Sequence, residues 1–139
     1  MELKPYTSVE ELQEDLVKHP LNKAALDEIC LEGICITFTK LQNEGYYIAY
    51  QIGSPEILVK DDSTPKEQDI TILHEIFHIL LNKKLGKTVK ISNPIYSQLD
   101  SIIDGEAQRL YKAEPWMVAY IKERAKIEHD MQEAGKHAV

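Results

Sequence analysis

The sequence has 139 residues, of which 43% are hydrophobic and 28% charged, with a formal net charge of −7 and a pI near 5.2. These values are typical of a single globular domain, and an acidic chain without a basic stripe is disfavoured as a direct DNA or RNA binder. No apolar run is long enough to span a bilayer, no signal peptide is visible, and the free thiols Cys30 and Cys35 are too few for a disulfide framework. We therefore expect a cytoplasmic protein without membrane contact.

Two helices are predicted in the first part of the chain, after an irregular lead-in over residues 1–6. The first spans about 8–18, because Ser8 and Glu11 have capping-box spacing and the apolar residues that follow recur at helical intervals. Pro20 ends this helix, and a second helix is expected over about 21–31.

Three strands are predicted next, at 34–41, 46–52 and 56–60. The segments are rich in β-branched and aromatic residues, and glycine-containing turns separate them. Because residues 42–45 have turn chemistry, the first two strands are expected to form a hairpin. The sheet should therefore be small, three-stranded and mostly antiparallel.

The longest predicted helix spans about 65–85. Thr64 is suited to the N-cap, Pro65 to the first helical position and Glu67 to the third, while Gly86 is placed to end the helix. The helix is apolar on nearly all sides, which is typical of a buried helix. It follows the third strand directly, so it should pack on one face of the sheet.

The remainder is predicted as a loop or weak hairpin over 87–96, a helix over 97–113 and a last helix that begins near Pro115. Residues 128–139 are polar and are expected to form an exposed tail. The expected fold is thus a single α+β domain over 1–139, in which helices pack on the small sheet and the 65–85 helix is buried.

The central motif is His74-Glu75-Ile76-Phe77-His78, an H-E-x-x-H pattern within the 65–85 helix. Residues four apart share one helix face, so the two imidazoles can bind a single Zn²⁺. Glu75 can then act on a water held at the metal. The structural alternative is a core helix whose histidines bind backbone carbonyls.

A catalytic zinc site also needs a third ligand from another element. Glu106 is the favoured candidate, because it falls on the apolar stripe of the 97–113 helix, where a carboxylate is costly unless it meets a cation or a metal. Asp100 and Asp104 compete for this role but lie off that stripe. The alternative for Glu106 is an ion pair with a lysine or arginine at the helix edge.

Two segments, HEIFHILL and EAQRLYKAEP, follow the predicted strands in the sequence. Together with those strands they resemble the ImmA/IrrE family of zinc metallopeptidases over about residues 25–120. The resemblance implies that His74, His78 and Glu106 bind zinc and that Glu75 is the general base. The chain departs from the family pattern after Leu110, because its segment between Leu110 and Pro115 is shorter than the family's.

The resemblance further implies a zinc-dependent endopeptidase that cuts a helix-turn-helix repressor of a phage or mobile element. Tyr96 and Tyr111 are candidates for a second donor to the oxyanion. Two other hypotheses stay open: a non-catalytic zinc protein that binds and displaces a repressor, and a metalloenzyme that acts on a non-peptide amide.

Overall fold

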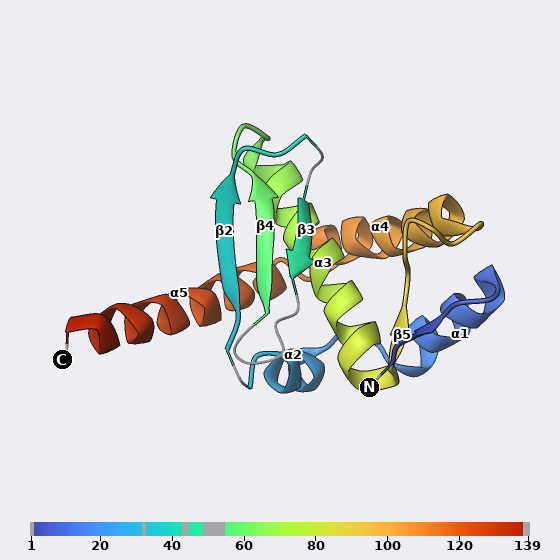
Figure 1. Cartoon of the computed structure of the whole chain (residues 1–139), viewed down its shortest axis with the longest axis horizontal. Helices are drawn as coiled ribbons and strands as arrows, with labels where there is room; N and C mark the ends of the chain where they lie inside the picture. Colours follow the sequence, from blue (N-terminus) through green and yellow to red (C-terminus); the bar gives the residue numbers. More distant parts are fainter. Residues whose placement is uncertain (1, 32, 43–44, 49–54, 138–139) are drawn as a thin grey trace.

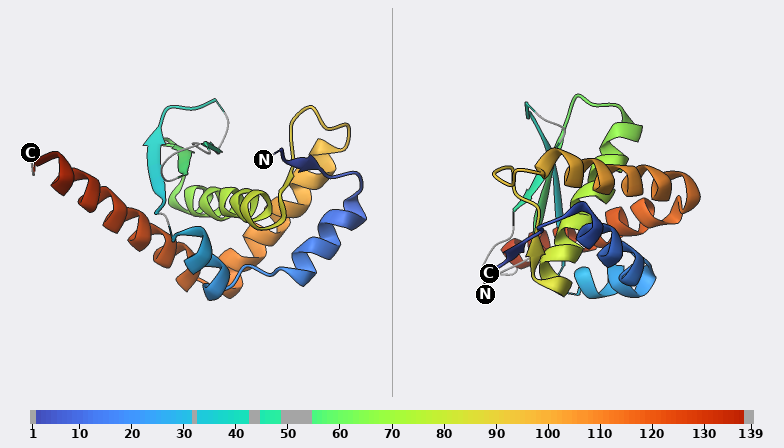
Figure 2. Two further views of the ribbon diagram at one scale, coloured as in Figure 1. Left: turned by 60° about the horizontal axis from the view of Figure 1, so that its bottom comes forward. Right: turned by 90° about the vertical axis from the view of Figure 1, so that its right-hand side faces the viewer.

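The computed structural model describes residues 2–31, 33–42, 45–48 and 55–137. The sheet lies over α3, α4 crosses α3, and α5 runs beneath the sheet and continues beyond it (Figures 1 and 2). In chain order the elements are β1 (Lys4–Pro5), α1 (Val9–Lys18), α2 (Lys23–Ile29), β2 (Cys35–Thr39), β3 (Gly45–Ile48), β4 (Glu56–Lys60), α3 (Pro65–Leu85), β5 (Lys87–Thr88), α4 (Tyr96–Ala113) and α5 (Trp116–His137).

Helix α3 has the ends that the sequence predicts. Thr64 accepts a hydrogen bond from the Glu67 amide, and the Glu67 side chain accepts one from the Thr64 amide, which completes a capping box. Gly86 ends the helix with φ 65°, in the left-handed region that glycine adopts without a steric cost. The ends of α3 are therefore fixed by local chemistry as well as by packing.

The predicted three-stranded sheet is present, but its mostly antiparallel arrangement is wrong. The strand order is β2-β4-β3, with β2 parallel and β3 antiparallel to β4, so the expected β2–β3 hairpin does not form. β4 is central because Ile57 and Val59 are fully buried on the face that packs against α3. Part of the second predicted strand, 49–52, lies outside the described residues.

The lead-in and the predicted loop after α3 join in a second, two-stranded sheet. β1 pairs in parallel with β5, and the Lys4 amide donates to the Gly86 carbonyl at 2.8 Å. The Asn93 side chain donates to the Tyr6 carbonyl at 2.9 Å, and the buried Tyr6 hydroxyl donates to Asp15 at 2.9 Å. The expectation of an irregular lead-in is thus wrong for Lys4 and Pro5.

The core is continuous from α1 and α2 through α3 to the first half of α5. The apolar stripe of α4 is completely buried except at Leu110, which is 4% exposed; its members are Leu99, Ile103, Ala107 and Leu110. Helix α5 continues to His137, where the sequence predicts a polar tail. None of the helices within the described ranges has the length and apolar character needed to span a bilayer.

Candidate metal centre

The two histidines of the motif lie on one face of α3, as predicted. Their ring centroids are 5.1 Å apart with an interplanar angle of 34°, and both side chains are largely buried. Glu75 is 7% exposed, and ligand atoms of His74, Glu75 and His78 all lie within 4.8 Å of one another. These three side chains therefore form a cluster that could hold a metal ion.

Helix α4 presents a polar row to these histidines. Tyr96, Asp100 and Asp104 follow one another at four-residue intervals and therefore share a helix face. Asp100 Oδ1 lies 2.9 Å from His74 Nε2 and 3.4 Å from His78 Nε2. A single carboxylate oxygen thus meets the Nε2 atoms of both histidines.

Asp104 contacts the opposite side of the His74 ring. Its Oδ1 lies 3.3 Å from His74 Nδ1, while its Oδ2 accepts a hydrogen bond of 2.7 Å from the Gln108 amide. The ring of His74 is therefore held by carboxylates at both nitrogens. This arrangement differs from the structural alternative, in which the histidines would bind backbone carbonyls.

The structure does not place Glu106 on the apolar stripe of α4. Its side chain is 32% exposed, and its carboxylate accepts two hydrogen bonds from Arg109, at 3.2 Å from Nε and 2.9 Å from Nη2. This is the ion pair that the sequence left open as the alternative. The buried stripe steps from Ile103 by four residues to Ala107, and Glu106 lies about 100° around the helix from Ala107.

The apolar stripe did not indicate that Asp100 contacts the two histidines, because a stripe alone does not identify a residue beside it. The available signal was the pairing of Asp100 with Asp104 at a four-residue spacing, which places two carboxylates on one helix face. Two histidines with the same spacing on α3 form a matching row.

The charges of the site depend on one another. Burial opposes protonation of His74, but the neighbouring carboxylates Asp100, Glu75 and Asp104 outweigh this effect and raise its pKa. Burial also opposes ionisation of Asp100, yet hydrogen bonds from His74 and His78 hold the pKa of Asp100 well below its ordinary value. Burial raises the pKa of Glu75, and the two histidines oppose this shift only in part.

The two candidate tyrosines have different surroundings. Burial raises the pKa of Tyr96, and the negative charges of Asp100 and Glu75 raise it further, so its phenol lies within electrostatic range of both carboxylates. Tyr111 instead packs against the hydrophobic core. Of the two, Tyr96 is the one that shares the α4 face of Asp100 and Asp104.

A comparison with protein-family models matches the part of the chain that contains this site. The family model of the M78 peptidases, described as the IrrE N-terminal-like domain, matches residues 32–128. The chain belongs to this family. The matched region of this IrrE-like chain includes α3 and α4 with His74, Glu75 and His78. Comparisons with curated proteins and with solved structures gave no significant match.

The donor set of the IrrE-like site fits a tetrahedral metal ion. Two ligands bound to zinc at about 2.0–2.1 Å in tetrahedral geometry are separated by about 3.3 Å. The distances from Asp100 Oδ1 to the two Nε2 atoms, 2.9 and 3.4 Å, bracket this separation. Two imidazoles and one carboxylate are also a common ligand set of catalytic zinc sites.

Proposed function

We propose that this chain is a zinc-dependent endopeptidase that hydrolyses a peptide bond in a protein substrate. The observation that carries the proposal is the approach of Asp100 to the Nε2 atoms of His74 and His78 beside the buried Glu75. Membership of a peptidase family supports the same reaction class.

His74, His78 and Asp100 are the proposed ligands. Zinc in such a site acts as a Lewis acid that lowers the pKa of a water and polarises a carbonyl. Glu106 as the third ligand stays a prediction, and the zinc affinities of Asp100→Asn and Glu106→Gln distinguish the two carboxylates.

Glu75 is the proposed general base. Burial raises the pKa of its carboxyl toward the range in which a base both accepts a proton readily and returns it. It would take a proton from the attacking water and pass it to the leaving amine. Because a general base contributes about 10²–10⁴-fold to rate, Glu75→Gln should lose nearly all activity while it keeps its metal.

Two further side chains of α4 have proposed supporting roles. Asp104 would accept the Nδ1 proton of His74 and so keep Nε2 free to bind the metal. The phenol of Tyr96 would donate to the oxyanion that forms on the substrate carbonyl, where the loss of one donor costs about 10²–10³-fold in kcat. Tyr96→Phe should therefore lower kcat without changing metal content.

The proposed substrate is a helix-turn-helix repressor of a phage or mobile element, and the proposed location is the cytoplasm. The substrate follows from the family resemblance, and the location follows from the cysteine content of the chain. No direct contact with nucleic acid is proposed, because the chain has a net charge of −7.

The test incubates the zinc-loaded protein with purified helix-turn-helix repressors encoded beside its own gene and measures intact masses. We expect two repressor fragments with the wild type and none with Glu75→Gln, at equal zinc content. Release of an intact repressor from DNA by both proteins would instead establish the non-catalytic alternative. An absence of both cleavage and release for every such repressor would contradict the proposed substrate.

A further inference from the structure

The outer edge of β2 has no partner strand within the described ranges. β2 is the terminal strand of the β2-β4-β3 sheet. The Cys35 amide donates to the Pro55 carbonyl at 3.0 Å, and the Thr39 carbonyl accepts from the Asp61 amide at 2.9 Å. Since backbone groups alternate in direction along a strand, those of Ile36 and Phe38 point away from β4.

The sequence of β2 lacks the features that normally prevent strand addition, and α5, which packs against this strand, leaves a cavity beside it. Natural edge strands are commonly protected by a charged side chain, a proline, a bulge or very short length. β2 is five residues long, reads CITFT and keeps an unbroken register with β4. Phe38 is 47% exposed. The unpaired N–H and C=O groups of Ile36 and Phe38 therefore form a template for another extended backbone.

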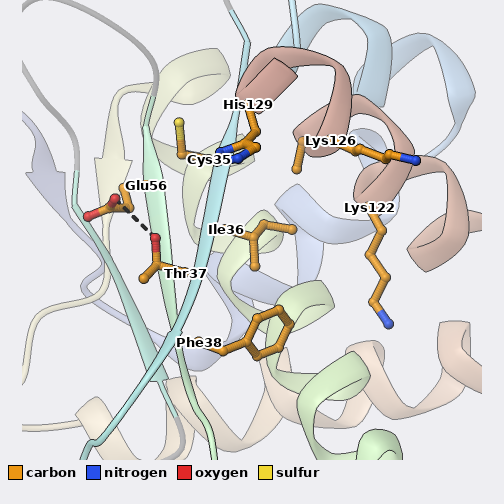
Figure 3. Close-up of a pocket in the computed structure, with 9 residues that line it drawn as sticks. Cys35, Ile36, Thr37, Phe38, Glu56, Lys122, Lys126 and His129 are labelled. Atoms are coloured by element: carbon orange, nitrogen blue, oxygen red, sulfur yellow. Dashed lines mark hydrogen bonds between the residues drawn. The ribbon is translucent and has the colours of Figure 1, made fainter. Parts of the chain in front are cut away.

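A cavity of about 470 Å³ runs along this edge between β2 and α5 (Figure 3). In the figure, Ile36 and Phe38 point toward α5, whereas Thr37 points toward Glu56. Ala125 lines the α5 wall together with charged or titratable side chains. The space beside the open edge is thus bounded by an apolar strand and a partly cationic helix face.

The charges along this cavity are not all paired. Thr37 donates a hydrogen bond to Glu56 at 3.3 Å, and Lys122 forms an ion pair with Asp69 at 2.5 Å. Lys126, in contrast, forms no ion pair with any residue that the structure describes. Figure 3 shows Lys126 on the opposite side of β2 from Glu56, so this ammonium favours a carboxylate on a segment that occupies the α5 side of the cavity.

We propose that the outer edge of β2 is a docking site for an extended, acidic segment of a protein partner. The segment would add as a further strand, with its backbone paired to Ile36 and Phe38 and an acidic side chain near Lys126. None of the residues that line this cavity belongs to the His74–Asp100 site. The inference therefore does not depend on peptidase activity.

The probe is a short, capped, fluorescein-labelled peptide in which glutamate alternates with valine and threonine. We expect hydrogen exchange of the Ile36 and Phe38 amides to slow when this peptide binds, and that of the Thr37 and Thr39 amides to stay unchanged. The same peptide with lysine in place of glutamate should bind more weakly.

Variants separate the charge contribution from the backbone contribution. Lys126→Glu should weaken binding of the acidic peptide by about tenfold, as expected for reversal of one close charge pair. Lys112→Glu on the exposed surface of α4 is the matched control and should not change it. Phe38→Pro removes the outward N–H together with the phenyl ring and should abolish binding, whereas Phe38→Ala removes the ring, keeps that N–H and should retain binding.

Two results would overturn the proposal. Equal binding of the acidic and basic peptides, without protection of the Ile36 and Phe38 amides, would show that the edge is not the docking site. A concentration-dependent dimer that protects the same two amides without peptide would show that a second copy of the chain occupies the edge.

Discussion

The carboxylate that completes the metal centre can be identified by comparing Asp100→Asn with Glu106→Gln. Both substitutions remove one negative charge from α4 and keep the size of the side chain. They differ in what the native carboxylate contacts: Asp100 meets the Nε2 atoms of His74 and His78, while Glu106 binds Arg109. Only the first contact bears directly on metal binding.

The expected magnitudes follow from these contacts. Loss of an outer partner of a metal ligand already weakens binding by about 10–100-fold, so loss of a ligand itself should raise the zinc Kd by more than about 100-fold, or about 2.7 kcal/mol. Asp104→Asn should fall in the 10–100-fold range, because Asp104 contacts His74 only at Nδ1. Glu106→Gln breaks a partly exposed ion pair worth about 0.3–0.5 kcal/mol of stability and should leave the zinc Kd within about twofold.

The assay removes metal with a chelator and titrates zinc back against a chromogenic competitor, with circular dichroism to establish that each variant is folded. The expected order of zinc Kd is wild type equal to Glu106→Gln, then Asp104→Asn, then Asp100→Asn. If Glu106→Gln weakened zinc binding as much as Asp100→Asn or more, Asp100 would not be the third ligand. The role predicted for Glu106 from the sequence would then stand.

Three further predictions concern stability. Ile76→Ala should lower the free energy of unfolding by about 2–5 kcal/mol in chemical denaturation, because Ile76 is fully buried, and Ile91→Ala at an 82% exposed position should change it by less than about 0.5 kcal/mol. Thr64→Ala should cost about 1 kcal/mol in the same assay through loss of the α3 cap, and no loss would mean that the cap is not formed in solution. Asp15→Asn should cost about 1.5–3 kcal/mol near pH 7, because Lys87 donates to this carboxylate at 2.7 Å. Burial opposes ionisation of Asp15, but the hydrogen bond from Lys87 keeps the pKa of Asp15 below the ordinary 3.8. The stability that Asp15 contributes is therefore present above about pH 4 and is lost as the pH falls further. A pH-independent difference in stability between wild type and variant would contradict this reasoning.

The helices could be predicted well because their signals are local. Thr64 and Gly86 mark the two ends of α3 in the sequence, and the structure has both caps where the pattern puts them. The H-E-x-x-H spacing likewise placed His74 and His78 on one face without any tertiary information.

The strand order and the contact of Asp100 with the histidines were harder to predict, because both depend on contacts between residues far apart in the sequence. The turn chemistry at 42–45 favours a hairpin, yet β4 takes the central position, where burial of Ile57 and Val59 outweighs the local preference. On α4, steps of three and four residues are both helical, so periodicity alone could not choose between Glu106 and Ala107 as the buried residue.

The short pairing of β1 with β5 gives the amino-terminal residues an influence on a site to which they contribute no ligand. Residues 86–95 connect α3 to α4. The Lys4 amide of β1 binds the Gly86 carbonyl at one end of this connection, and the Tyr6 carbonyl, just after β1, accepts from Asn93 near the other end. These contacts of the amino-terminal residues therefore restrain the position and angle at which α4 begins. A bulky fusion or a proteolytic cut that detached this strand would change the distance between Asp100 and the two histidines while all three side chains remained intact.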